Sequence, residues 1–292
     1  MSILEVQSAS PEPVVLQRAR RRWGGSLGMT GWIAVAVLAL LALVAIVGPM
    51  LVQTDPDSIS LFDSFGPPAP GHPRGFDGQG RDLFARLVFG ARSSLIGPVL
   101  VVIISMTLGG IIAVSAAWIG GTYDSIVARV IDALFAFPGL LLAIVAVALF
   151  EPGLLAASIA LSIGYTPYVA RIIRSAVLRE RSLPYVSALT VQGLSGTTIA
   201  LRHLLPNCSG ILVAAATLSY GYALIDLAAL SFIGLGVQAP QSDWGVMVAS
   251  GIPGILAGFP QESLYAGLCI VIAVGAVNLL GDRITAIAEA RR

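Results

Sequence analysis

The stretch LIGPVLVVIISMTLGGIIAVSAA, residues 95–117, is apolar over its whole length and contains no charged side chain. A helix of about 20 apolar residues crosses the roughly 30 Å hydrocarbon core of a bilayer. Backbone groups find no water to bond in that core, so an apolar run that enters it has to form a helix. This stretch therefore predicts a transmembrane helix.

The composition indicates the same for most of the chain. Its 292 residues are 56% hydrophobic and only 11% charged, and the mean hydropathy is +0.87. Ordinary soluble domains carry about 25% charged residues, so lipid is the expected solvent. A net charge of +1 gives no reason to expect nucleic acid as a partner. We predict an all-α integral membrane protein with about six transmembrane helices. The expected spans are residues 31–52, 95–117, 132–150, 154–173, 209–235 and 262–281.

The distribution of arginine predicts the topology, because cytoplasmic loops are enriched in basic residues. Arg18 and Arg20 to Arg22 precede the first span, which places the tail of residues 1–30 in the cytoplasm. Six crossings return the tail of residues 282–292 to the same side. The connection of residues 182–207 is then also cytoplasmic. The loop of residues 53–94 is expected outside, although it holds four arginines, Arg74, Arg81, Arg86 and Arg92.

Three further expectations concern the loops and the span ends. Residues 81–94 have helical spacing of apolar residues and are expected to lie along the membrane surface as a helix. Residues 236–260 are rich in proline and glycine, which predicts a short external re-entrant or surface helix instead of a seventh span. All four tryptophans lie near predicted span ends, as in an aromatic belt. They are Trp23, Trp32, Trp118 and Trp244.

No set of catalytic residues is visible in the sequence. It has no phosphate-binding Gly-Lys-Ser/Thr loop, and its two histidines, His72 and His203, have no nucleophile beside them. Cys208 and Cys269 lack metal-ligand spacing. We therefore expect a protein that is no enzyme and binds no metal or cofactor itself. Energy for transport would come from a partner or from an ion gradient.

The predicted cytoplasmic connection carries the most specific pattern. YVSALTVQG at residues 185–193 is followed, nine residues later, by HLLPN at residues 203–207. The pattern predicts a short amphipathic helix that breaks at Gly193 and a second helical turn that ends at Pro206, together forming a rigid knob. The residues expected to matter are Tyr185, Ser187, Ala188, Leu189, Gly193, His203, Leu204, Leu205 and Pro206.

This pattern resembles the EAA loop of binding-protein-dependent ATP-binding-cassette (ABC) importer permeases. Ser187 stands where that family has glutamate, and Leu189 where it has alanine. The resemblance implies that the knob sits in a groove of an ATPase subunit and transmits its closure to the spans. His203 is expected to be a packing and hydrogen-bonding member of this loop and not a proton switch.

Further stretches resemble the second permease subunit of dipeptide and oligopeptide importers. They are HPRGFDGQGRD at 72–82, FGARSSL at 89–95, residues 129–144, LSFIGLGVQ at 230–238, SDWG at 242–245 and NLLGD at 278–282. The resemblance implies an inner-membrane permease that pairs with a homologous permease. It also implies two ATPase subunits that carry ATP and Mg²⁺, and an external substrate-binding protein.

Several residues keep two interpretations. Gly80, Arg81 and Asp82 are expected either to cap a helix or to contact substrate, and Asp132 to stabilise the start of the third span. Pro138 is expected either to kink the pore wall or merely to be tolerated. Asp226 lies inside an apolar run, so it should face protein or water. We expect Asp226 either to line the translocation path or to bond to the partner permease or a neighbouring helix.

The substrate class rests on the resemblance alone. Close relatives carry nickel, glutathione or other small solutes. The rival hypothesis is an ion-coupled secondary transporter, which should show several intramembrane carboxylates and an inverted repeat. The sequence shows one such carboxylate and no clear repeat. A scaffolding membrane protein would leave the motifs around Gly80 and Gly193 unexplained.

Overall fold

The computed structural model describes residues 27–149 and 151–290. Most of the predicted cytoplasmic tail of residues 1–30, together with Trp23 and the last two arginines, lies outside the described residues. Within them the chain forms helices and no named strand. The predicted all-α class is confirmed.

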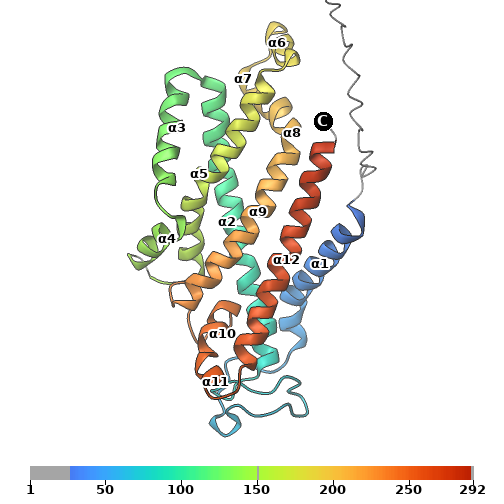
Figure 1. The fold of residues 1–292 in the computed structure, drawn as a ribbon, viewed down its shortest axis with the longest axis vertical. Coiled ribbons are helices and arrows are strands. Elements are labelled where there is room, and N and C mark those ends of the chain that lie inside the picture. The colour runs from blue at the N-terminus through green and yellow to red at the C-terminus, as the bar shows by residue number, and fades with distance from the viewer. Residues whose placement is uncertain (1–26, 150, 291–292) are drawn as a thin grey trace, which may run out of the picture.

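Five helices of the described part are long and apolar enough to cross a membrane, and a bent pair makes up to six. The five agree with the predicted first, second, fourth, fifth and sixth spans, and they run along the long axis of the molecule (Figure 1). They are α1 (Gly28–Leu51), α2 (Leu83–Ile119), α5 (Leu154–Arg181), α9 (Ser209–Phe232) and α12 (Gln261–Ala290).

The third span is not the single helix predicted over residues 132–150. Its place is taken by α3 (Gly121–Phe135) and α4 (Gly139–Ala148), which meet at an angle of 79°. The break falls at Pro138, whose ring fixes its φ, removes a donor and disfavours a helical conformation of the residue before it. The kink interpretation of Pro138 therefore agrees with the structure.

Asp132 does not begin a span. It lies near the end of α3 with its side chain 65% exposed, 4.0 Å from the Arg171 guanidinium on α5. The expected role at a helix start was wrong because the helix begins eleven residues earlier, at Gly121.

The predicted surface helix over residues 81–94 is also wrong as a separate element. These residues form the first turns of α2, which continues without a break to Ile119. Asp82 caps the helix by accepting a hydrogen bond from the Ala85 amide at 2.6 Å. Leu83 and Ala91 are buried in an apolar cluster with Trp244 and Ala266, so this stretch packs against protein instead of lying along lipid.

Residues 53–82 and 233–260, here called the cap, lie together at one end of the bundle (Figure 1). They contain a 3₁₀ turn at Leu61–Asp63, α10 (Trp244–Ser250) and α11 (Ile252–Leu256). The short helices α10 and α11 agree with the expectation that no seventh span lies here. The rings of Phe65 and Phe259 stack with centroids 4.8 Å apart and join the two halves of the cap.

The tryptophans divide into two groups. Trp32 is 62% exposed on α1, as expected of an aromatic belt. Trp244 is 1% exposed and donates from its indole nitrogen to the Leu87 carbonyl at 3.1 Å. It therefore belongs to the protein core, and its assignment to the belt was wrong.

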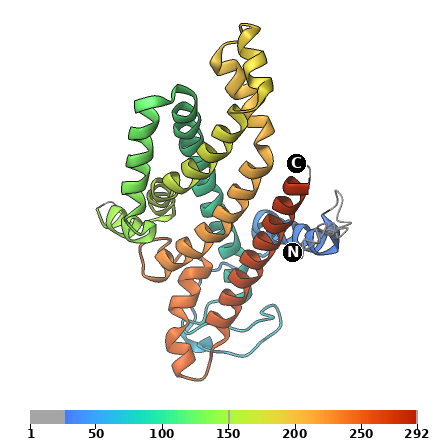
Figure 2. The ribbon, with the colours of Figure 1, turned by 45° about the horizontal axis from the view of Figure 1, so that its top comes forward.

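Small residues allow the long helices to pack closely. A Cβ added at Gly109 of α2 would lie 2.9 Å from Val169 and 3.0 Å from the Ala170 amide on α5. Such contacts hold helices together where the surrounding lipid is as apolar as the side chains. Figures 1 and 2 show α3 and α4 on one flank of the bundle and α1 on the other. A partner protein would therefore meet the bent pair of α3 and α4 on one flank and the single helix α1 on the other.

Candidate functional site

Residues 182–207, here called the coupling segment, lie at the end of the bundle opposite the cap (Figure 1). The segment begins with α6 (Pro184–Val191) and turns at Gln192–Gly193 into α7 (Gly196–Ile199). A π-helical stretch (Ala200–Leu204) and α8 (Leu205–Asn207) then lead into α9. The two helical parts around the break at Gly193 agree with the predicted pattern. The predicted end of the second part at Pro206 is wrong, because Pro206 stands in the first turn of α8, where proline is tolerated, and the helix continues to Asn207.

The inner side of the coupling segment is anchored in a buried apolar cluster. Val186 of α6, Ile199 of α7 and Leu204 pack against the ends of α2 and α5. Tyr185 and Leu189 add partly buried surface to the same cluster. Burying a branched aliphatic side chain contributes about 1.5–3 kcal/mol, so the segment is fixed to the ends of two spans.

A polar clamp ties the two ends of the segment to α5. The Tyr185 hydroxyl donates to the Glu180 carboxylate at 3.0 Å. The Asn207 amide donates to Glu180 at 3.2 Å and to the Tyr185 hydroxyl at 3.0 Å. Glu180 was not among the residues predicted to matter, and its only sequence signal is that it stands between two arginines at a span end.

Trp118, at the end of α2, is a second anchor. The Arg181 guanidinium lies 5.2 Å from the centre of its ring and donates to the Ala117 carbonyl. A Cβ at Gly196 would lie 2.1 Å from the indole nitrogen, so α7 touches this ring directly. Trp118 therefore holds the coupling segment, which its assignment to an aromatic belt had missed.

The turn between α6 and α7 depends on Gly193. Its φ of +80° lies in the left-handed region, which costs other residues conformational energy. Its amide donates to the Thr190 carbonyl at 3.0 Å, and the Leu194 amide donates to the Leu189 carbonyl at 3.3 Å. These bonds close the end of α6 and direct the chain into α7.

The outer side of the coupling segment is exposed. Val191 is 88% exposed and Leu201 is 62% exposed. Ser187, Ala188 and Pro206 are also exposed, while Leu205 and His203 are half-buried. The predicted residues thus divide between an anchoring side and an exposed apolar side. A rigid base below an exposed apolar tip is suited to docking against another protein.

In the cap, the predicted signature residues have structural partners. Gly80 has φ +73°, and a Cβ there would lie 1.7 Å from the Ser60 carbonyl oxygen. The Arg81 guanidinium donates to Asp77 at 2.7 Å. Asp82 caps α2 and also lies 2.5 Å from the His72 ring nitrogen. The capping interpretation therefore agrees with the structure.

A buried ionic network that the sequence analysis missed lies beside this signature. Arg86 is fully buried, and one of its terminal nitrogens donates to both Asp77 and Glu262, the latter at 3.0 Å. With Arg81 the network holds two cations and two anions, so its charges balance. It joins the start of α2 to the start of α12.

Asp226 of α9 accepts a hydrogen bond from the Tyr165 hydroxyl of α5 at 2.8 Å. Of the interpretations that the sequence left open, this contact matches the bond to a neighbouring helix. The pair borders an apolar cluster in which α4, α5 and α9 meet. Asp226 is half-buried, so part of the residue is exposed at the surface of the bundle.

Residues 85–292 match the family described as binding-protein-dependent transport system inner membrane component. The chain belongs to this family. Its members are inner membrane components of transport systems. The recognition of an ABC importer permease from the coupling-segment pattern is thereby confirmed.

Curated relatives of this transport component agree with the narrower resemblance. A putative peptide transport system permease protein of Brucella suis biovar 1 (strain 1330) is 36% identical over 97% of this chain and 93% of its own length. The dipeptide transport system permease protein of Bacillus subtilis (strain 168) is 36% identical over 90% and 81%. The glutathione transport system permease protein of Pectobacterium atrosepticum is 35% identical over 74% and 71%.

Among solved structures, a chain of the MetNI methionine ABC transporter in inward-facing conformations is similar to this component. The TM-score is 0.58 with 20% sequence identity, and the match covers 70% of this chain and 96% of that one. At this identity the likeness concerns the fold. It supports the arrangement of long helices described above.

Proposed function

We propose that this chain is one of two homologous permease subunits that together form a path for peptides across the cytoplasmic membrane. The family assignment and the named functions of the relatives support this proposal. The substrate path would lie between the two permeases and alternate between outward and inward access. A substrate-binding protein would deliver peptides at the cap.

The observation that carries the proposal is the form of the coupling segment. An exposed apolar tip at Val191 and Leu201 stands on a base that is anchored in α2 and α5. Movement of a partner that grips this tip would be transmitted to the spans, because the base cannot shift independently of them. We therefore infer that two ABC ATPase subunits bind here. ATP and Mg²⁺ would be held by those subunits and not by this chain.

The charges of the cap support an orientation with the coupling segment in the cytoplasm. The loop of residues 53–94 holds more arginine than the positive-inside distribution predicts for the outside, yet three of its four arginines have partners within the fold. Arg81 and Arg86 share Asp77, and Arg74 lies 5.3 Å from the centre of the Tyr265 ring. Asp77 and Glu262 balance the charges of Arg81 and Arg86. The arginines of this loop are therefore explained by their partners within the fold, and their number does not contradict the proposed topology.

Asp226 and Pro138 remain our candidates for the translocation path. A carboxylate inside a span is costly unless it faces protein or water, and Asp226 has one neutral partner, Tyr165, recorded in the described residues. The bend at Pro138 gives the bundle an irregular flank beside α5. Irregular backbone at membrane depth is tolerated where it is covered by protein or lines a water-filled path. A second permease could cover this flank.

Cysteine labelling tests the orientation. Ser64 of the cap and Ser182 of the coupling segment are both exposed and lie at opposite ends of the bundle. In a background without Cys208 and Cys269, Ser64→Cys should react with an impermeant maleimide on intact cells. Ser182→Cys should react only after permeabilisation. Labelling of Ser64→Cys only after permeabilisation would contradict the orientation.

Reconstitution tests the transport function. Proteoliposomes that hold both permeases and both ATPases should accumulate a labelled dipeptide when ATP and the binding protein are supplied. This chain alone should neither accumulate peptide nor hydrolyse ATP, because energy comes from the partners. Ion-driven uptake by the chain alone would instead identify a secondary transporter. Uptake of nickel or glutathione in preference to dipeptides would contradict the substrate assignment.

A further inference from the structure

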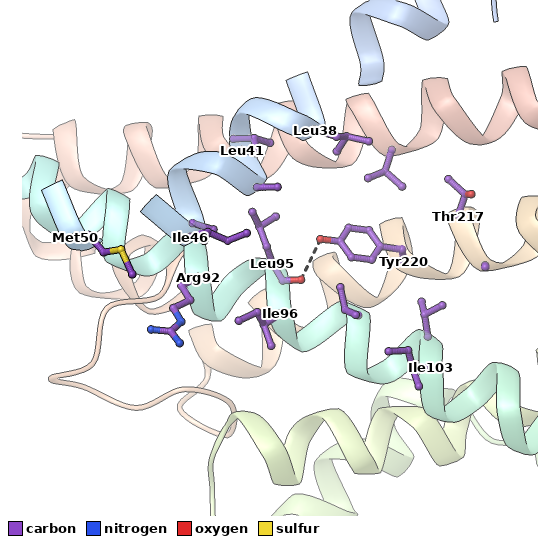
Figure 3. Close-up of a pocket in the computed structure, with 16 residues that line it drawn as sticks. Leu38, Leu41, Ile46, Met50, Arg92, Leu95, Ile96, Ile103, Thr217 and Tyr220 are labelled. Atoms are coloured by element: carbon purple, nitrogen blue, oxygen red, sulfur yellow. Dashed lines mark hydrogen bonds between the residues drawn. The ribbon is translucent and has the colours of Figure 1, made fainter. Parts of the chain in front are cut away.

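An apolar groove opens between α1 and α2, with α9 and α12 at its floor (Figure 3). Its volume is about 760 Å³. Leu38, Ala42 and Ile46 of α1 face Leu95 and Ile103 of α2 across it. Neither Asp226 nor Pro138 of the candidate path is among the residues that line the groove. Figure 2 shows α1 on the flank of the bundle opposite α3 and α4.

The polar groups inside the groove are already bonded. The Tyr220 hydroxyl donates to the Leu95 carbonyl at 3.1 Å, as drawn in Figure 3. The Thr217 hydroxyl donates to the Val213 carbonyl at 2.7 Å. Because neither group needs a new partner, the interior of the groove favours an apolar ligand.

The length of the groove corresponds to one leaflet of a bilayer. Along α2 it extends from Arg92 to Ile103, a distance of about 16 Å at 1.5 Å per residue. Half of a hydrocarbon core of roughly 30 Å is about 15 Å. A transmembrane helix of a partner would need a groove about twice as long, whereas a lipid acyl chain of one leaflet fits this length.

Arg92 lies at the cap end of the groove, where a lipid headgroup would stand (Figure 3). The Arg92 side chain is exposed. Within residues 27–149 and 151–290, the structure shows no ion pair or hydrogen bond of this side chain. The other arginines of the same loop, Arg74, Arg81 and Arg86, all have partners within the fold. A guanidinium forms strong paired hydrogen bonds with phosphate.

We propose that this groove binds an anionic phospholipid from the leaflet on the cap side. One acyl chain lies between α1 and α2, and the Arg92 guanidinium binds the phosphate of the headgroup. The lipid fills a space that the helices leave open and fixes α1 against α2. This inference does not depend on the transported solute, because neither Asp226 nor Pro138 lines the groove.

Native mass spectrometry of the intact importer complex, titrated with dioleoylphosphatidylglycerol or dioleoylphosphatidylcholine, tests the proposal. The wild-type complex should bind the anionic lipid more tightly. Arg92→Gln should weaken that binding about fivefold, since one arginine contributes on this scale at an anionic membrane surface. It should leave binding of the zwitterionic lipid nearly unchanged. Arg129→Gln, an exposed arginine on α3, is the matched control and should change neither.

A second pair of variants tests the groove itself. Ala42→Phe fills the groove and should weaken binding of both lipids, whereas Ala39→Phe on the same helix lies outside the groove and should not. Equal binding of both lipids by the wild type and by Arg92→Gln would overturn the proposal. Loss of the partner permease from the Ala42→Phe complex, with the Ala39→Phe complex intact, would also overturn it. That result would show that the partner occupies the groove.

Discussion

Replacing Arg86 with methionine is expected to destabilise the protein by about 3–5 kcal/mol, the cost of breaking a buried ion pair by removing one partner. Arg86 is 0% exposed and bonds to both Asp77 and Glu262. Methionine has a similar length but no charge, so Glu262 would keep a buried carboxylate without its cation. Asp77 would still have Arg81, 2.7 Å away. Thermal denaturation of the purified complex in detergent measures the loss.

Two controls separate the network from a general effect of removing arginine. Arg74→Met removes an exposed arginine that lies over the Tyr265 ring, and such contacts contribute about 0.5–1 kcal/mol. Arg86→Met combined with Glu262→Met removes both charges of the long-range pair. The double variant should lose less stability than the two single variants together, by at least about 1 kcal/mol. Additive losses, or an equal loss in Arg74→Met, would contradict the role of the network.

The sequence was sufficient for five of the six predicted spans, because the apolar character of a span is a local property. Residues 95–117 are apolar throughout, and lipid leaves such a run no alternative to a helix. The start of α2 was different. Residues 81–94 are less apolar and were predicted to lie along the membrane surface, yet Leu83 and Ala91 are buried against α10 and α12. This packing joins distant parts of the chain, so the local sequence does not indicate it.

The third span shows a second limit. Pro138 marks a break in the helix, but a proline does not determine how far the chain turns there. The helices meet at 79°, and Val147 of α4 and Leu161 of α5 lie in one buried apolar cluster. The ionic network at Arg86 likewise depends on contacts between distant parts of the chain, since Glu262 is 176 residues away from Arg86 in the sequence. Neither residue's local sequence indicates the other.

The coupling segment was predictable in outline and not in its anchors. The spacing from Tyr185 to Gly193 and on to Pro206 predicted two short helices around a glycine break, and the structure has both. The direction of each side chain was not predictable. Trp118 points at Gly196 and Arg181 instead of at lipid, because its orientation depends on a segment that follows it by almost 80 residues.

The second large effect is expected at Gly193, where valine should abolish substrate-stimulated ATP hydrolysis by the assembled complex. A Cβ at this position would meet nothing within 4 Å, so the substitution causes no collision. The φ of +80° is the difficulty, since a β-branched residue pays about 1–3 kcal/mol to adopt it. The chain can relieve that strain by redirecting α7 relative to α6, which distorts the tip that is proposed to dock. Membrane insertion should be unchanged, because the spans are not touched.

Two matched variants distinguish backbone conformation from side-chain chemistry. Asparagine enters the left-handed region at low cost, so Gly193→Asn should retain most of the stimulated hydrolysis although it adds a larger polar side chain. Ser187 is exposed, and an exposed substitution of this kind changes stability by no more than about 0.5 kcal/mol. Ser187→Ala should therefore couple almost normally. A loss in Gly193→Asn equal to that in Gly193→Val would show that any side chain there obstructs the ATPase. A defect in Ser187→Ala as large as that in Gly193→Val would show that the hydroxyl, and not the shape of the segment, makes the contact.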